Sequence, residues 1–174
     1  YDRGAVRCGV VHLGIGAFHR AHQAVVFEQA LNAGDLRWGI VAASLRSPGV
    51  RDQMAPQDGL YTMLVRDGVA DRAQVVGAVQ QVIVAPEEPE ALLAALASPD
   101  THIVTLTVTE KGYKLDPATG ALIESDPQLA ADLASLDKPQ TAPGYLVAAL
   151  ARRRAAGLPV LSAIGTQSRG KGFT

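Results

Sequence analysis

The stretch VVHLGIGAFHRAHQ, residues 10–23, decides how the fold is interpreted. A run of strand-forming residues leads into Gly14 and Gly16, and a helical pattern begins near Phe18. In a dinucleotide-binding turn, the first glycine allows a sharp bend and the second lets backbone N–H groups approach a pyrophosphate. The third glycine position holds His19. Taken alone, the stretch leaves a cofactor turn and an ordinary strand-to-helix turn about equally open.

The missing third glycine weakens the match without removing the chemistry. That glycine only lets the helix pack closely on the strand, so we expect His19 to displace or rotate the helix slightly. The helix that follows would still present free N–H groups and its positive dipole end to an anion. As an isolated feature, His19 is more often a packed or exposed helix residue than a catalytic one.

The residues around this turn predict a doubly wound α/β domain. Residues 7–14 indicate a buried strand, residues from Phe18 to the NAG stop at 32–34 a helix, and residues 38–45 a second strand. Further along, the pattern predicts helices at 86–100, 128–136 and 143–157, and strands at 102–109 and 158–164. This alternation is typical of a Rossmann-type, mostly parallel sheet.

Two β-rich pieces interrupt the alternation, at residues 60–68 and 73–85, around the turn DGVADR. They predict antiparallel strands or an insertion beside the main sheet. The run Arg152-Arg153-Arg154 ends a predicted helix, where cations are favourable, and we expect it to be solvated.

The composition excludes several classes of function. Sixteen basic and seventeen acidic residues give a net charge of −1, which does not favour a nucleic-acid partner. The single cysteine, Cys8, excludes an intrachain disulfide and a cysteine-based zinc site, and we expect no metal. No apolar run approaches the roughly 20 residues that span a bilayer. We therefore expect a cytoplasmic protein with no membrane partner.

Four segments resemble, in the same order, the long-chain mannitol dehydrogenase family, which includes mannitol 2-dehydrogenase and fructuronate reductase. They are HLGIGAFHRAHQA (12–24), SLRSPGVRDQMAPQDGLYTMLVR (44–66), TLTVTEKGYKLDPATGAL (105–122) and GYLVAALARRRAAGLP (144–159). In this family a histidine stands at the third glycine position. The resemblance therefore favours a cofactor-binding turn.

The resemblance implies a Rossmann domain that binds NAD(H), or NADP(H), without a metal. Hydride would pass between the nicotinamide and an open-chain sugar alcohol or keto-sugar. Carried over by position, the cofactor-binding residues are Gly14, Ile15, Gly16, Ala17, Phe18, His19, Arg20, Ala21 and His22 of the pyrophosphate loop, together with Arg46, Thr109 and Glu110. Glu110 and Lys111 could equally be a solvated loop pair, and Arg46 a surface charge.

Cofactor choice is left open by the loop after the second strand. A domain that selects NAD usually carries an acidic residue there, which binds the ribose hydroxyls. Here Gly49 stands where members of the family often carry Asp, and Arg46 lies close by. The resemblance favours NAD, and NADP or mixed use stays possible.

The end of the sequence departs from the family. The family continues from the last strand with S-C-D-N-x-x-x-N-G and a helical domain that contains the catalytic lysine, whereas this sequence reads AIGTQSRGKGFT after Ser162. We expect a Rossmann domain over 1–162, an atypical tail over 163–174, no C-terminal substrate domain and no catalytic residue in this chain. It would be a fragment, or a chain whose reading frame is lost after Ser162.

The predicted function is therefore the NAD(P)-binding domain of a polyol or hexuronate oxidoreductase, inactive alone, whose substrate in the intact enzyme is a small polyol or keto-sugar. The alternative is a non-catalytic nucleotide-binding or regulatory module. The particular sugar and the oligomeric state are left open.

Overall fold

The centre of the molecule is a five-stranded sheet with the order β5-β2-β1-β6-β7. The structure is a computed structural model, and it describes residues 1–66 and 68–165, without the side chain of Glu110. The strands are β1 (Val10–Leu13), β2 (Ile40–Ser44), β5 (Val79–Val84), β6 (Ile103–Leu106) and β7 (Ser162–Gly165). All neighbouring pairs are parallel, so the predicted doubly wound Rossmann-type sheet is confirmed.

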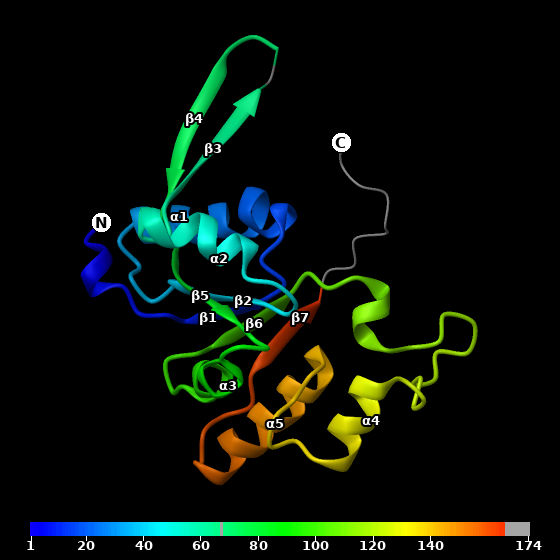
Figure 1. Cartoon of the computed structure of the whole chain (residues 1–174). Coiled ribbons are helices and arrows are strands. Elements are labelled where there is room, and N and C mark those ends of the chain that lie inside the picture. Colours follow the sequence, from blue (N-terminus) through cyan, green and yellow to red (C-terminus); the bar gives the residue numbers. More distant parts are fainter. Residues whose placement is uncertain (67, 166–174) are drawn as a thin grey trace.

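Helices cover both faces of this sheet (Figure 1). On one side lie the turn η2 (His19–Gln23) and helices α1 (Ala24–Asn32) and α2 (Gly49–Met54). On the other side lie α3 (Pro89–Ala97) and α5 (Ala142–Ala155), with α4 (Pro127–Ala134) next to α5. The described residues also contain three short 3₁₀ segments: η1 (Arg3–Ala5), η3 (Ala55–Gln57) and η4 (Glu110–Tyr113).

Two apolar cores form because successive strand residues point to opposite faces. In β1, Val11 and Leu13 face α3 and α5, and they pack in one core with Leu92, Leu96 and Tyr145. Val10 belongs to the other core, which includes Ala24 and Leu31 of α1 and Met54 of α2. His12 alternates with Val11 and Leu13, so it lies on the Val10 face, beneath the start of the first helix.

The two β-rich pieces were only partly predicted. Strands β3 (Tyr61–Arg66) and β4 (Asp71–Val76) do form an antiparallel hairpin, which projects from the α2 side of the molecule (Figure 1). The second piece, however, divides at Gly77, and its second half becomes β5, which pairs with β2 in the main sheet. The Gly77 N–H donates to the buried carboxylate of Glu28 at 2.8 Å. That long-range contact stabilises the break.

Two boundaries also differ from the sequence analysis. The expected loop after β2 contains helix α2 from Gly49 onward. Strand β7 starts at Ser162 rather than at residue 158 of the predicted strand, and it pairs with β6 as far as Gly165, so it includes residues 163–165 of the expected tail. The rest of the expected tail, residues 166–174, lies outside the described residues. The division into domain and tail stays a prediction.

The arginine run at the end of α5 is not simply solvated, as was expected. Arg153 is only 2% exposed. Its guanidinium donates to the carbonyl oxygens of Ser98 at 2.7 Å and Pro159 at 2.9 Å. Arg152 forms an ion pair with Glu90 on α3. A guanidinium has five N–H donors, so backbone carbonyls beyond a helix end can satisfy it in a buried position.

Candidate functional site

A cavity of about 300 Å³ opens at the carboxyl ends of β1, β2 and β6. Its walls come from residues 14–16, 44–46 and 107–109, from η4, and from residues 140–142 before and at the start of α5, with Gln128 of α4. The strand order reverses between β1 and β6, and ligands of doubly wound sheets bind at such a reversal. The cavity therefore lies where ligands bind in folds of this kind.

The glycine turn shapes one wall of this cavity. Gly14 has φ = +103°, and a Cβ there would lie 2.7 Å from the carbonyl oxygen of Thr107. Only glycine fits such a position without strain. At Gly16, by contrast, an added Cβ would meet nothing closer than the Gly14 oxygen at 3.9 Å. The space beside Gly16 is thus open cavity.

The helix after the turn begins with free backbone donors. Its first regular hydrogen bond runs from the Arg20 N–H to the Gly16 carbonyl at 3.2 Å. The N–H groups of Ala17, Phe18 and His19 precede this bond and have no partner within the helix. Such groups, together with the helix dipole, favour an anion at this end. The turn can therefore bind a phosphate through backbone atoms.

The ring of His19, which the resemblance places in the pyrophosphate loop, does not line the cavity. His19 is fully buried beneath the turn, stacked on His12 with ring centroids 3.5 Å apart and planes 10° apart. Its Nδ1 bonds Gln23 Oε1 at 2.9 Å, and within the described part of the chain its Nε2 has no hydrogen-bond partner. Its backbone N–H is one of the three without a partner within the helix.

The helix accommodates this ring by a local widening. The Ala24 N–H donates to the His19 carbonyl, five residues back, which makes one π turn over residues 19–23. Such wide turns occur often at functional sites. The change that the structure shows is this π turn, where the sequence predicts a displaced or rotated helix.

Burial keeps both stacked histidines neutral. Burial and, to a smaller extent, the neighbouring His19 together lower the pKa of His12 to about 3. Burial likewise lowers the pKa of His19 to about 4, with Arg20 contributing in the same direction. Two uncharged rings therefore support the turn at neutral pH.

Acid should destabilise the fold through these two histidines. An unfolded histidine has a pKa of about 6.5, so below that pH the unfolded chain binds more protons than the folded chain. Their contribution is complete above pH 6.5 and is lost as the pH falls towards the folded pKa values of about 4 and 3. Each unit of depression corresponds to about 1.4 kcal/mol, so the loss reaches several kcal/mol.

Urea unfolding of the chain between pH 7 and pH 4 measures this loss. The variant His12→Gln, which removes one of the two groups, should lose less stability over the same range. The control His22→Gln changes an exposed histidine and should follow the parent chain. An identical loss in the parent and in His12→Gln would contradict the assignment.

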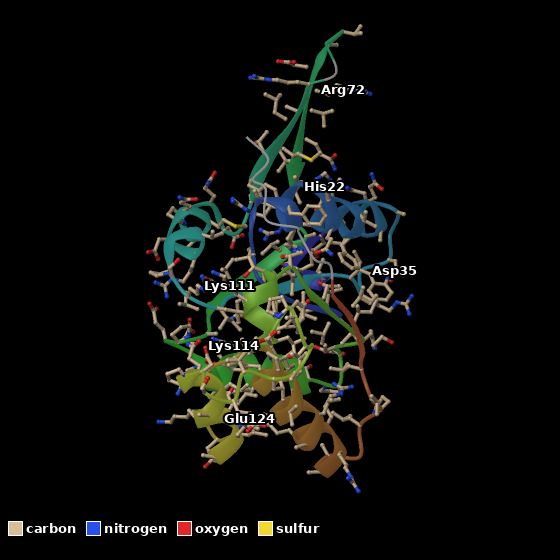
Figure 2. The ribbon with its side chains drawn as sticks, turned by 90° about the vertical axis from the view of Figure 1, so that its right-hand side faces the viewer. His22, Asp35, Arg72, Lys111, Lys114 and Glu124 are labelled. Atoms are coloured by element: carbon tan, nitrogen blue, oxygen red, sulfur yellow. The ribbon has the colours of Figure 1, made fainter. Side chains whose placement is uncertain are left out.

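The cavity is lined by cations. Arg46 and Lys111 are exposed at its rim, and in the described residues neither has an ion-pair partner. Lys114 also lines it and bonds Asp126 at 2.7 Å and Gln128 at 2.9 Å, which joins η4 to α4. Figure 2 shows Lys111 on η4 and Lys114 directly after it, with His22 above them in the view. None of the described side chains lining the cavity is a carboxylate, which suits an anionic ligand.

The structure brings together some of the predicted site residues and not others. Those that line the cavity are Gly14, Ile15, Gly16, Arg46 and Thr109. Those that do not are Ala17, Phe18, His19, Arg20, Ala21 and His22. In this second group, His22 packs against Phe18, and the Arg20 carbonyl accepts a hydrogen bond from the Tyr61 hydroxyl at 2.6 Å. The backbone of Glu110 begins η4, and its side chain lies outside the described part.

Sequence reasoning missed the loop that closes the cavity on the α5 side. Buried Asp132 on α4 accepts hydrogen bonds from the backbone N–H groups of Gln140 and Thr141, at 2.8 and 2.9 Å. Thr141 in turn caps α5 by accepting from the Gly144 N–H at 3.0 Å. The sequence Thr-Ala-Pro-Gly is a recognisable helix start, with a capping threonine and an early proline. Nothing in the sequence indicates that Asp132 holds it.

Two further features are absent from the described residues. No group of three or more His, Cys, Asp and Glu in residues 1–66 and 68–165 could hold a metal ion. No helix in the same residues is long and apolar enough to cross a membrane.

Comparisons with known proteins give matches along nearly the whole chain. Residues 8–165 match a family model described as the mannitol dehydrogenase Rossmann domain. The chain is 43% identical over 176 residues to a mannitol 2-dehydrogenase of Pyrenophora tritici-repentis, covering 98% of the chain and 31% of that protein. It is 44% identical over 160 residues to the uncharacterized oxidoreductase YeiQ of Escherichia coli, covering 91% of the chain and 33% of that protein.

Two solved structures of dehydrogenases also match nearly the whole chain. The mannitol 2-dehydrogenase of Pseudomonas fluorescens, in a ternary complex with NAD and D-mannitol, superposes with a TM-score of 0.90 at 38% identity, covering 96% of the chain and 35% of that protein. A substrate-free D-sorbitol dehydrogenase gives a TM-score of 0.89 at 35% identity, covering 97% and 36%. The chain thus spans about a third of the length of the proteins it matches.

Proposed function

We propose, on the premise that this chain belongs to the mannitol dehydrogenase family as one of its Rossmann domains, that it binds NAD(H) at the Gly14–Gly16 turn. The observation that carries the proposal is the turn itself. It combines open space beside Gly16 with three free helix N–H groups at the point where the strand order reverses.

The residues of the cavity fit a dinucleotide. A pyrophosphate needs close approach to backbone donors, and the absence of a Cβ at Gly16 allows it. Arg46 and Lys111 add positive charge without a described carboxylate in the lining to compete with the ligand. Once bound, the nicotinamide would exchange a hydride with a carbon atom of the substrate.

The role of this chain in that reaction is binding and orientation. Hydride transfer from an alcohol also needs a base for the hydroxyl proton and donors for the developing charge on oxygen. Lys114, which lines the cavity, already donates hydrogen bonds to Asp126 and Gln128. We propose that the base and the polyol or keto-sugar site belong to a protein of the relatives' length, in which this domain holds the cofactor. A cytoplasmic location, and the lack of nucleic-acid or membrane partners, stay predictions of the sequence.

Calorimetric titration of the purified chain with NADH tests cofactor binding directly. We expect a saturable heat with one site per chain, and competition by ADP-ribose, which carries the pyrophosphate without the nicotinamide. No heat at millimolar NADH and NADPH would refute the proposal.

Cofactor choice is the finer part of the proposal. We propose that the domain accepts NADP(H) as well as NAD(H), because the end of β2 presents Arg46 to the cavity. A charge-assisted hydrogen bond contributes about 1.5–3 kcal/mol, so Arg46→Ala should weaken NADPH binding by about ten-fold or more. Binding of NADH should stay nearly unchanged.

The two dissociation constants, measured by the same titration for parent and variant, check this. Arg66→Ala on the projecting hairpin, where Arg66 faces Asp71, is a control of equal charge change. Equal weakening of NADH and NADPH by Arg46→Ala would show that Arg46 does not read the 2′-phosphate.

A further inference from the structure

Three polar groups contact the carbonyl oxygen of Gly14. The Gly16 N–H and the Thr107 hydroxyl each donate to it at 2.6 Å, and His12 Nε2 lies 3.1 Å away. On the other side of the turn, the N–H groups of Gly14 and Ile15 donate to the Ala43 carbonyl at 2.9 and 3.3 Å. The peptide groups that enter the turn are therefore fixed from both sides.

The hydrogen bonds assign the proton on His12. The single hydroxyl proton of Thr107 goes to the Gly14 carbonyl, so His12 Nε2 shares its one proton between the Thr107 oxygen at 2.9 Å and the Gly14 carbonyl at 3.1 Å, in a three-centre hydrogen bond. Nε2 must then carry the proton. Since the buried ring is neutral, Nδ1 is the acceptor, and the Thr105 hydroxyl donates to it at 2.7 Å.

These contacts follow from the register of the sheet. His12 and Thr105 are direct partners in the parallel pairing of β1 with β6, so their side chains share one face. A polar chain thus runs from Thr105 through His12 to Thr107 and the turn. His19 completes it from the helix side, because its ring stacks on His12 and limits the plane that the His12 ring can adopt.

We propose that His12 is a positioning residue for the pyrophosphate. His12 does not line the cavity, so it acts by orienting the Gly14 carbonyl, and through it the turn from which the free N–H groups project. This inference rests on the proposed function, since it assumes that the turn binds a cofactor. This role also explains why a histidine stands at the third glycine position. The His19 ring stacks on the His12 ring, and His12 orients the Gly14 carbonyl.

A pair of amide variants separates positioning from simple packing. The glutamine side chain can place an N–H near the position of Nε2, whereas asparagine reaches only the region of Nδ1. His12→Gln should therefore keep the donor to Gly14 and bind NADH within about three-fold of the parent chain. His12→Asn keeps the Thr105 contact, loses the donor to Gly14, and should bind NADH about ten-fold more weakly.

The matched control is Thr101→Val. Thr101 is 2% exposed and its hydroxyl donates to the Ala95 carbonyl at 2.8 Å, so the variant removes a buried side-chain bond to a carbonyl far from the turn. It should lower the thermal midpoint and leave the NADH dissociation constant unchanged. Equal NADH affinity of His12→Asn and His12→Gln, whether reduced or unchanged, would overturn the inference.

A second measurement needs neither ligand nor variant. Long-range nitrogen–proton NMR spectra of ¹⁵N-histidine-labelled chain should show the proton of His12 on Nε2 and that of His19 on Nδ1. A proton on Nδ1 of His12 would overturn the inference even if the variants do not fold. Failure of the parent chain to bind NADH would instead refute the proposed function, which keeps the two outcomes distinct.

Discussion

Gly16→Val should abolish the binding of NADH by this chain while leaving its fold intact. The fold tolerates the change because an added Cβ meets nothing closer than 3.9 Å. Binding does not, because the valine methyl groups would occupy the space through which a pyrophosphate reaches the backbone N–H groups. We expect a loss of at least about 100-fold in affinity, or about 3 kcal/mol. Calorimetric titration and thermal unfolding of the same sample measure both quantities.

Another glycine provides a contrast for this prediction. Gly14→Val combines a φ of +103° with a 2.7 Å clash against the Thr107 carbonyl, and it should lose stability as well as binding. NADH binding by Gly16→Val at parental affinity would place the cofactor elsewhere.

His19→Gly, which restores the complete three-glycine fingerprint, should destabilise the protein by about 3 kcal/mol. Removing a large buried side chain typically costs about 2–5 kcal/mol, and glycine inside a helix costs about 1 kcal/mol more than alanine. Relief of the unpartnered Nε2 acts in the opposite direction, by about 1–3 kcal/mol. The loss of packing and of the stack on His12 is the larger effect.

Urea unfolding at neutral pH measures this difference, with His19→Ala as the control that separates helix propensity from the loss of the ring. The free energy of unfolding of His19→Ala should be about 1 kcal/mol higher than that of His19→Gly. A His19→Gly variant as stable as the parent would mean that the ring only fills space which the helix can close.

Much of the fold could be predicted because its signals are local. The apolar residues of β1, β2 and β6 and the Gly14 turn indicate buried parallel strands with a crossover helix. The division of the second β-rich piece at Gly77 could not be predicted, because it depends on the carboxylate of Glu28, 49 residues away. The burial of Arg153 likewise depends on carbonyl groups from Ser98 and Pro159, which no local pattern brings to the end of α5.

The candidate site divides in the same way. Gly14 and Gly16 are recognisable because a turn that approaches a phosphate requires them in any sequence context. The inward direction of the His19 ring was missed, since it depends on His12 occupying a strand position that would ordinarily be apolar. The hydrogen bonds from the backbone N–H groups of residues 140 and 141 to Asp132 join residues that no periodic pattern relates, so they leave no signal in the sequence.

The most direct test of the central claim is an NMR titration of ¹⁵N-labelled chain with NADH. We expect the largest amide shifts on residues 16–19, where the free N–H groups of Ala17, Phe18 and His19 would meet the pyrophosphate, with smaller shifts after β2 and β6 at Arg46 and at residues 107–109. In Gly16→Val the same titration should leave these amides unmoved. Saturable binding whose shifts avoid residues 16–19, or no shifts at millimolar NADH, would contradict the account.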